Sequence, residues 1–175
     1  MILHHAVEPD HRTVQRPEPI VGEWRSELVK VSMSVDIDAP PERVWPYLVE
    51  PEKTKSWYTM LEKFEYTSDG PGPGSTFYWE EDIRGKIYWN HFRTTEWVEG
   101  RVFAYEMTSS SFFKSYTERW EIEPTPTGCR FSFNDDLVFP HGPWGRVMGF
   151  FGERMGKKSN QQVLQNLKRL AEADT

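Results

Sequence analysis

The chain has 175 residues and a mass of 20.6 kDa, a length that suits one domain with its own core and is short for two. Its 21 basic and 27 acidic residues give a net charge of −6, which argues against nucleic acid and anionic membrane surfaces as partners. Cys129 is the only cysteine, so an intrachain disulfide and a cysteine-based zinc cluster are excluded, and a reducing, cytoplasmic location is expected. Aromatic residues form 15% of a chain that is only 37% hydrophobic, so aromatic rings supply an unusual share of its apolar surface.

The first segment, residues 1–27, carries scattered prolines and charges without a hydrophobic period, and it is expected to be a loose arm. The folded domain is expected over residues 28–175. No stretch of the sequence has the roughly 20 apolar residues of a membrane span, and no secretory signal is recognisable. The histidines of the arm, His4, His5 and His11, lack a fixed geometry, so neither a metal site nor a cofactor is expected.

Strand and helix patterns follow in chain order. Apolar and polar residues alternate over residues 29–38, which predicts a half-buried strand. Pro41 is placed to begin a short helix, and a second short helix is expected to start near Pro51 and to bring Trp57 inward. Turn residues then separate six further predicted strands, at residues 64–67, 76–82, 86–98, 102–108, 115–123 and 129–139. The short connections are typical of an antiparallel meander, and the whole order is that of an α+β domain.

A long helix is predicted from about residue 143 to 173, where no further proline occurs. Gly145, Gly149, Gly152 and Gly156 recur at spacings of four, three and four, which places them on one helical face. Each interior glycine destabilises a helix by about 1 kcal/mol relative to alanine. Two interpretations stay open: the bare face borders a ligand cavity, with Gly149 and Gly152 near the ligand, or it lets the helix approach the sheet closely.

Several local sequences resemble one known family. They are residues 35–45 at the strand-to-helix junction, Trp57-Tyr58 after the second helix, residues 95–103 at a strand-turn-strand corner, residues 122–124 with Gly128 before the last strand, and residues 166–168. In these local sequences the chain resembles the START-like superfamily with the helix-grip fold, also called SRPBCC. Within that superfamily it resembles the polyketide cyclase/dehydrase and lipid-transport group. The resemblance covers about residues 29–172. The sequence departs from the family pattern at Glu99, where the family often has proline.

The resemblance implies a curved antiparallel sheet of about seven strands wrapped around the long C-terminal helix, with two short helices after the first strand. It also implies a cavity between sheet and helix that holds a small hydrophobic ligand. Aromatic residues are the candidates to line that cavity, although for any single one an ordinary core position is the favoured interpretation: Trp57, Tyr78, Trp89, Tyr105, Trp120 and Phe133.

Two carboxylates lie on otherwise apolar strand faces. Glu118 shares its face with Tyr116 and Trp120, and Asp135 shares its face with Phe133. A buried carboxylate must be paired, hydrogen-bonded or neutral, and burial raises its pKa towards the range of a general acid or base. The alternative is that these strand ends are exposed, or that a nearby arginine, Arg93 or Arg119, neutralises the carboxylates.

The strand at residues 86–98 has two faces, and either could point inward. Cyclase-like members of the family place aromatics and a basic residue along this strand, so we expect the face with Trp89, His91, Arg93 and Trp97 to be the inner one. His91 could then transfer protons, and Arg93 could hold a carboxylate or enolate oxygen. The alternative is a His–Arg pair that faces solvent.

Three functions remain as hypotheses. The first is a protein that binds a small hydrophobic ligand, aromatic, polyketide-like or lipid-like. The second is a cofactor-independent polyketide aromatase/cyclase-dehydratase that uses His91, Arg93, Glu118 or Asp135 for proton transfer. The third is a partner-binding module that uses the arm or the outer sheet face. A homodimer is compatible with the sequence.

Overall fold

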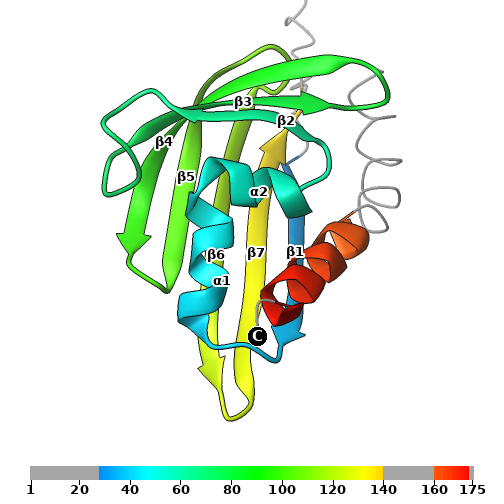
Figure 1. Ribbon diagram of the computed structural model, residues 1–175. Helices are drawn as coiled ribbons and strands as arrows, with labels where there is room; N and C mark the ends of the chain where they lie inside the picture. Colours follow the sequence, from blue (N-terminus) through cyan, green and yellow to red (C-terminus); the bar gives the residue numbers. More distant parts are fainter. Residues whose placement is uncertain (1–27, 140–159, 174–175) are drawn as a thin grey trace, which may run out of the picture.

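The computed structural model describes residues 28–139 and 160–173, in which seven strands and three helical segments form one α+β unit (Figure 1). The elements are β1 (Leu28–Ile37), α1 (Pro41–Val49), α2 (Pro51–Trp57), β2 (Leu61–Tyr66), β3 (Thr76–Asp82), β4 (Ile87–Val98), β5 (Val102–Ser110), β6 (Ser115–Thr125) and β7 (Gly128–Val138). Residues 160–173 are helical and close the described chain. The arm expected over residues 1–27 lies outside the described residues.

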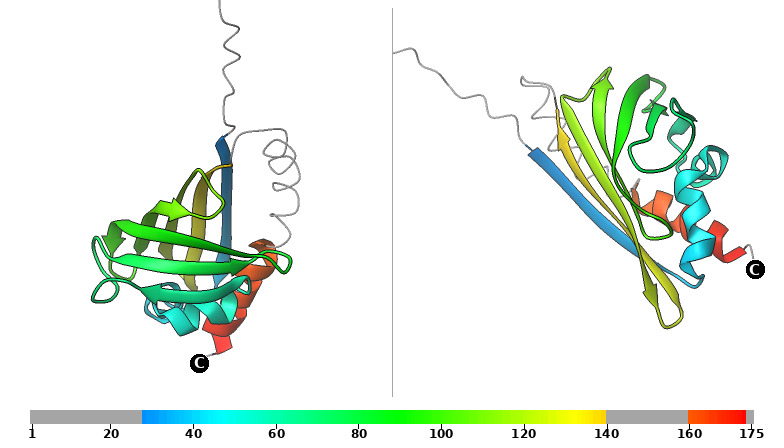
Figure 2. Two further views of the ribbon diagram at one scale, coloured as in Figure 1. Left: turned by 90° about the horizontal axis from the view of Figure 1, so that it is seen from above. Right: turned by 90° about the vertical axis from the view of Figure 1, so that its left-hand side faces the viewer.

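The seven strands form a single antiparallel sheet in the order β1-β7-β6-β5-β4-β3-β2. From β2 to β7 each strand pairs with its neighbour in the chain, as the short turns predict, and β1 returns to pair with β7. The helices α1, α2 and 160–173 all lie on one face of the curved sheet (Figure 2). The predicted helix-grip architecture is therefore confirmed.

Two residues at positions of the family pattern, Gly128 and Glu99, lie at turns of the sheet, and the structure shows their roles. A Cβ atom on Gly128 would lie 2.2 Å from the carbonyl oxygen of Ile37, so only glycine lets β7 begin this close to the end of β1. Glu99, which departs from the family pattern, accepts hydrogen bonds from the indole nitrogens of Trp45 and Trp97 at 2.9 and 3.0 Å. That turn is thereby tied to α1.

The core lies between the concave face of the sheet and the helices. Trp57, at the end of α2, is fully buried and donates its indole N–H to the carbonyl oxygen of Tyr47 at 2.7 Å. From the last helix, Val163 and Leu167 are buried in the same core. The predicted inward position of Trp57 and the packing of the helix end are therefore both observed, whereas Gly145, Gly149, Gly152 and Gly156 lie outside the described residues.

The expected inner face of β4 is wrong. Asn90, Phe92 and Thr94 are buried, whereas Trp89 is 40% exposed and Arg93 faces outward. Both faces carry apolar residues, and side chains alternate with a period of two, so a shift by one residue exchanges the faces. Trp97 still packs against the core, because the pairing of β4 with β5 shifts between Thr94 and Glu96.

Candidate functional site

The concave face of the sheet buries three carboxyl groups among aromatic rings. They come from Glu81 on β3, Glu118 on β6 and Asp135 on β7, with exposed fractions of 5%, 5% and 7%. Each occupies a polar position in a strand whose neighbours on the same face are apolar, so the strand alternation itself turns the group inward. Glu118 and Asp135 are also directly opposite in the β6–β7 register.

Glu118 is the carboxyl group with the most hydrogen-bond donors. Its Oε2 accepts from the hydroxyl groups of Tyr105 and Tyr116, the latter at 2.5 Å, and its Oε1 accepts from the indole nitrogen of Trp120. Burial raises the pKa of Glu118, and these three donors act in the opposite direction because they stabilise the carboxylate. Of the three acids, Glu118 thus receives the most hydrogen bonds that favour the charged form.

Glu81 is held by two donors. The hydroxyl of Tyr58 donates to its Oε1 at 3.1 Å, and the amide nitrogen of Asn90 donates to its Oε2 at 3.3 Å. Burial dominates and raises the pKa of Glu81 to about 7, with the nearby charge of Glu118 acting in the same direction. Near neutral pH this group is therefore divided between its acid and its carboxylate.

Asp135 differs from Glu81 and Glu118 in its hydrogen bonding. Within the described part of the chain its Oδ1 is buried and receives no hydrogen bond from an N–H or O–H group. Its carboxyl group hydrogen-bonds that of Glu118, and burial together with the Glu118 charge raises the pKa of Asp135 well above its usual range. A protonated Asp135 can donate this hydrogen bond to Glu118, and the bond in turn lowers the pKa of Glu118.

Asp135 lines two cavities. The larger has a volume of about 150 Å³ and is lined mainly by apolar side chains of β1, β7 and the segments beside them, with Tyr58, Glu81, Tyr116, Asp135 and Asn160 as its polar groups. The smaller, of about 20 Å³, has room for roughly one water molecule and lies against Trp57, Glu118, Trp120 and Phe133. Tyr58, Asp135 and Asn160 line both cavities.

The predicted site residues divide into two groups. Trp57, Trp120 and Phe133 line the smaller cavity with Glu118 and Asp135, and Tyr105 donates to Glu118 beside them. Tyr78, Trp89, His91 and Arg93 form the second group and lie on the opposite, convex face, where His91 packs between the rings of Tyr78 and Trp89.

The predicted neutralising arginines do not reach the buried acids. Arg93 forms an ion pair with Glu106, and Arg119 forms ion pairs with Glu96 and Glu121. Proton transfer by His91 and Arg93 inside the cavity is therefore incompatible with their positions.

Sequence reasoning missed Glu81, Tyr58 and Asn90. The signal for Glu81 was present, because it shares the inner face of its strand with Phe77 and Trp79, the same alternation that indicates Glu118 and Asp135. Asn90 was missed because the wrong face of β4 was expected inside. Tyr58 follows a helix and carries no strand pattern, so only the tertiary structure brings it to Glu81.

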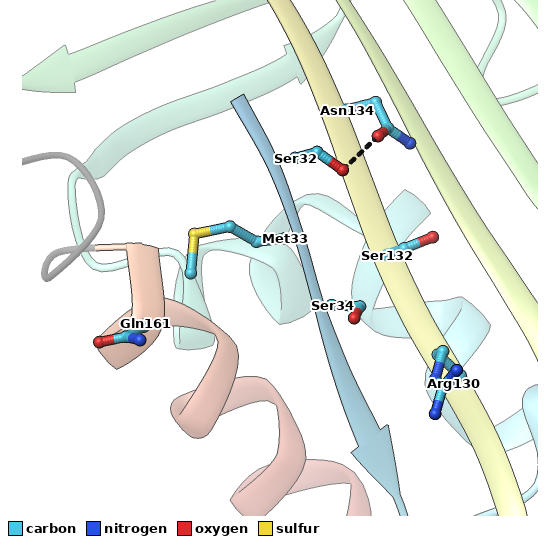
Figure 3. Close-up of a pocket in the computed structure, with 7 residues that line it drawn as sticks. All are labelled: Ser32, Met33, Ser34, Arg130, Ser132, Asn134 and Gln161. Atoms are coloured by element: carbon cyan, nitrogen blue, oxygen red, sulfur yellow. Dashed lines mark hydrogen bonds between the residues drawn. The ribbon is translucent and has the colours of Figure 1, made fainter. Parts of the chain in front are cut away.

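A separate surface depression, distinct from the two cavities at Asp135, lies across the edge strand β1 and is largely polar. Its lining residues are shown in Figure 3: Ser32, Met33, Ser34, Arg130, Ser132, Asn134 and Gln161. It measures about 520 Å³ and is open, and Ser32 donates to Asn134 at 2.7 Å while Arg130 pairs with Asp36. Ser32, Asn134 and Arg130 thus have partners at an open surface, whereas the cavities at Asp135 border buried carboxyl groups, so the latter are the stronger candidate for a functional site.

Comparison with known proteins identifies the family. The family described as polyketide cyclase / dehydrase and lipid transport matches residues 29–172, nearly the whole of the predicted domain. The chain belongs to this family. Curated relatives in Mycobacterium tuberculosis and Mycobacterium bovis, both named as uncharacterised proteins, are 28% identical over 102 residues. That match covers 57% of this chain, and the chain spans 60% of the length of these relatives.

Solved structures share the fold of this polyketide cyclase / dehydrase and lipid transport family member. The Zhui aromatase/cyclase from a Streptomyces species has a TM-score of 0.71 at 17% identity, over 83% of this chain and 94% of that chain. A START superfamily protein from Mycobacterium smegmatis has a TM-score of 0.70 at 15% identity, over 84% and 99% of the two chains. In the described part of the chain, no helix is long and apolar enough to cross a membrane.

Proposed function

We propose that the protein binds a small, mainly apolar molecule in the larger cavity, with the polar end of the molecule at Asp135. The observation that carries the proposal is a mainly apolar cavity lined by Asp135, whose buried Oδ1 receives no hydrogen bond from the described residues. Buried polar groups normally have hydrogen-bond partners, and ligand sites typically combine apolar walls with a few convergent polar groups. Membership of a family described by polyketide cyclisation and lipid transport supports the same reading.

The volume of the cavity limits the size of the ligand that it can hold. Ligand pockets typically measure about 300–1,000 Å³, so the 150 Å³ bounded by the described residues suits one or two rings better than a long acyl chain. Its apolar lining includes Val29, Val31 and Leu137, together with the ring of Phe113. Such walls contribute affinity through burial of apolar surface and leave orientation to the few polar groups.

The test is calorimetric titration with 1-naphthylmethanol, a two-ring probe with one hydroxyl group. Val31→Phe should fill the cavity and weaken binding at least tenfold, because Val31 faces inward from β1. Ser32→Phe is the matched control, since Ser32 lies on the opposite face of the same strand and should leave affinity within twofold. Absence of binding to the wild-type protein, or equal affinity in the two variants, would refute the proposal.

A second candidate function is proton transfer on an enolisable ketone, and the position of Glu81 favours it. Glu81 lines the larger cavity, and its pKa of about 7 suits a general base at neutral pH. Its carboxylate would remove a proton from the carbon next to a bound carbonyl, and the electron pair of that C–H bond would form the enolate. Return of a proton from the carboxyl group to carbon restores the ketone.

Deuterium exchange tests this second function. The methyl protons of 2-acetylnaphthalene, followed by NMR in D₂O, should exchange faster with the protein than in buffer. Glu81→Gln should abolish the acceleration, whereas Glu80→Gln, at the next position on the outer face, should keep it. An exchange rate equal to that of buffer would exclude this function without affecting the binding proposal.

A further inference from the structure

The larger cavity is rich in hydrogen-bond acceptors and poor in donors. Tyr58 and Tyr116 both line it, yet their hydroxyl hydrogens are donated to Glu81 and Glu118. Glu81 and Asp135 add carboxyl oxygens to the same wall. Of the described polar lining residues, only Asn160 brings N–H groups that are not engaged in these bonds.

The acceptor that lacks a donor is on Asp135. When its proton is donated to Glu118, its carbonyl oxygen keeps lone pairs that can only accept. This carboxyl group lines both cavities, and its Oδ1 has no donor among the described residues. Leaving a buried acceptor unsatisfied is unfavourable, so a ligand that supplies a donor gains affinity there.

We infer that the cavity selects ligands whose polar end is a hydrogen-bond donor, a hydroxyl or an amine, and that Asp135 accepts this hydrogen bond. The inference rests on the proposed binding function and adds the chemical class of the ligand. It also excludes carboxylates, because an anion would enter a poorly solvated site that already holds the carboxyl groups of Glu81, Glu118 and Asp135. An ether or ketone without a donor would fit the apolar walls but leave Asp135 unsatisfied.

Four naphthalene probes of similar shape test the inference. They are 1-naphthylmethanol, 1-(methoxymethyl)naphthalene, 1-naphthylmethylammonium and 1-naphthoate, each titrated by calorimetry at neutral pH. The alcohol or the ammonium ion is expected to bind about tenfold more tightly than the ether, and naphthoate more weakly than all others. Comparison of the alcohol with the ammonium ion shows which of the two donors the site prefers.

Variants of Asp135 test whether this residue causes the preference for a hydrogen-bond donor. Asp135→Leu removes the acceptor and should reduce the preference for alcohol over ether to less than twofold. Asp135→Asn should keep the preference, because the amide nitrogen can donate to Glu118 while the amide oxygen still accepts. Asp136→Leu and Asp136→Asn are the controls, since Asp136 is the next residue of β7, is on the opposite face and pairs with Lys30 at 2.8 Å.

The outcomes separate this inference from the binding function. If no probe binds, or if Val31→Phe binds normally, the proposed function itself fails. If the probes bind but the ether equals both donors, or naphthoate binds most tightly, the binding function stands and the ligand class is wrong. The same holds if Asp135→Leu keeps the full preference. The comparison of alcohol with ether in the wild-type protein needs no variant, so poor folding of Asp135→Leu would not prevent refutation.

Discussion

The strongest prediction concerns the effect of pH on stability through Glu81. In the native protein, burial raises the pKa of Glu81 to about 7, whereas the ordinary value is 4.5. Between these values the native state holds a proton that the unfolded chain has released. Because the unfolded state binds fewer protons, raising the pH favours unfolding in this window. The contribution is complete below about pH 4.5 and is lost as pH rises through about 7.

The magnitude follows from the same two values. The full difference corresponds to about 3 kcal/mol, and about 2.5 kcal/mol of it falls between pH 5 and pH 8. Glu81→Gln removes the titration and keeps an amide that can accept from Tyr58. The free energy of unfolding of the wild-type protein should therefore fall by about 2.5 kcal/mol more than that of Glu81→Gln over this range.

Urea denaturation followed by tryptophan fluorescence at pH 5, 6, 7 and 8 provides the measurement. Glu118 and Asp135 are present in both proteins, so the difference between the two pH profiles measures the titration of Glu81 together with its electrostatic effect on these neighbours. Glu80→Gln is the control on the outer face of β3 and should follow the wild-type profile. Parallel profiles for the wild-type protein and Glu81→Gln would refute the argument that burial keeps this carboxyl group protonated.

Two further predictions test the packing. Trp57→Ala should lower the free energy of unfolding by about 3–5 kcal/mol, because Trp57 is fully buried and donates to Tyr47, whereas Trp89→Ala on the convex face should lower it by less than about 1 kcal/mol. Comparable losses in urea denaturation would contradict the assignment of faces. Gly128→Ala should be destabilising by about 1–3 kcal/mol, since its Cβ would lie 2.2 Å from the Ile37 carbonyl oxygen, and a melting temperature equal to wild type would contradict that contact.

The alternation of β6 and β7 was sufficient to predict the inner positions of Glu118 and Asp135. Each strand there has large aromatic residues on one face and small or charged residues on the other, so only one orientation buries the rings. The fold followed from the same alternation, the proline and glycine turns and the family resemblance. Local sequence was therefore informative wherever one face was clearly more apolar than the other.

β4 lacks that asymmetry, and its orientation depends on its neighbours. Trp89 and His91 look suited to a core, yet the pairing with β3 places Asn90 opposite the buried Trp79 and Phe92 opposite the buried Phe77. The shift in the β4–β5 pairing then brings Trp97 back to the core. Neither the pairing nor the shift is encoded in the strand's own pattern, so the candidates His91 and Arg93 were assigned to the wrong face.

The buried acids are better explained by a ligand than by stability. Replacing buried ionisable groups with apolar residues of similar size is often neutral or stabilising, so a fold optimised for stability alone has no need of three carboxyl groups in its core. Tyr105, Tyr116 and Trp120 satisfy Glu118. Among the described residues, by contrast, the buried Oδ1 of Asp135 has no donor, and Asp135 lines both cavities. A donor that arrives with a ligand would complete the network, and this is the physical reason to expect recognition at Asp135.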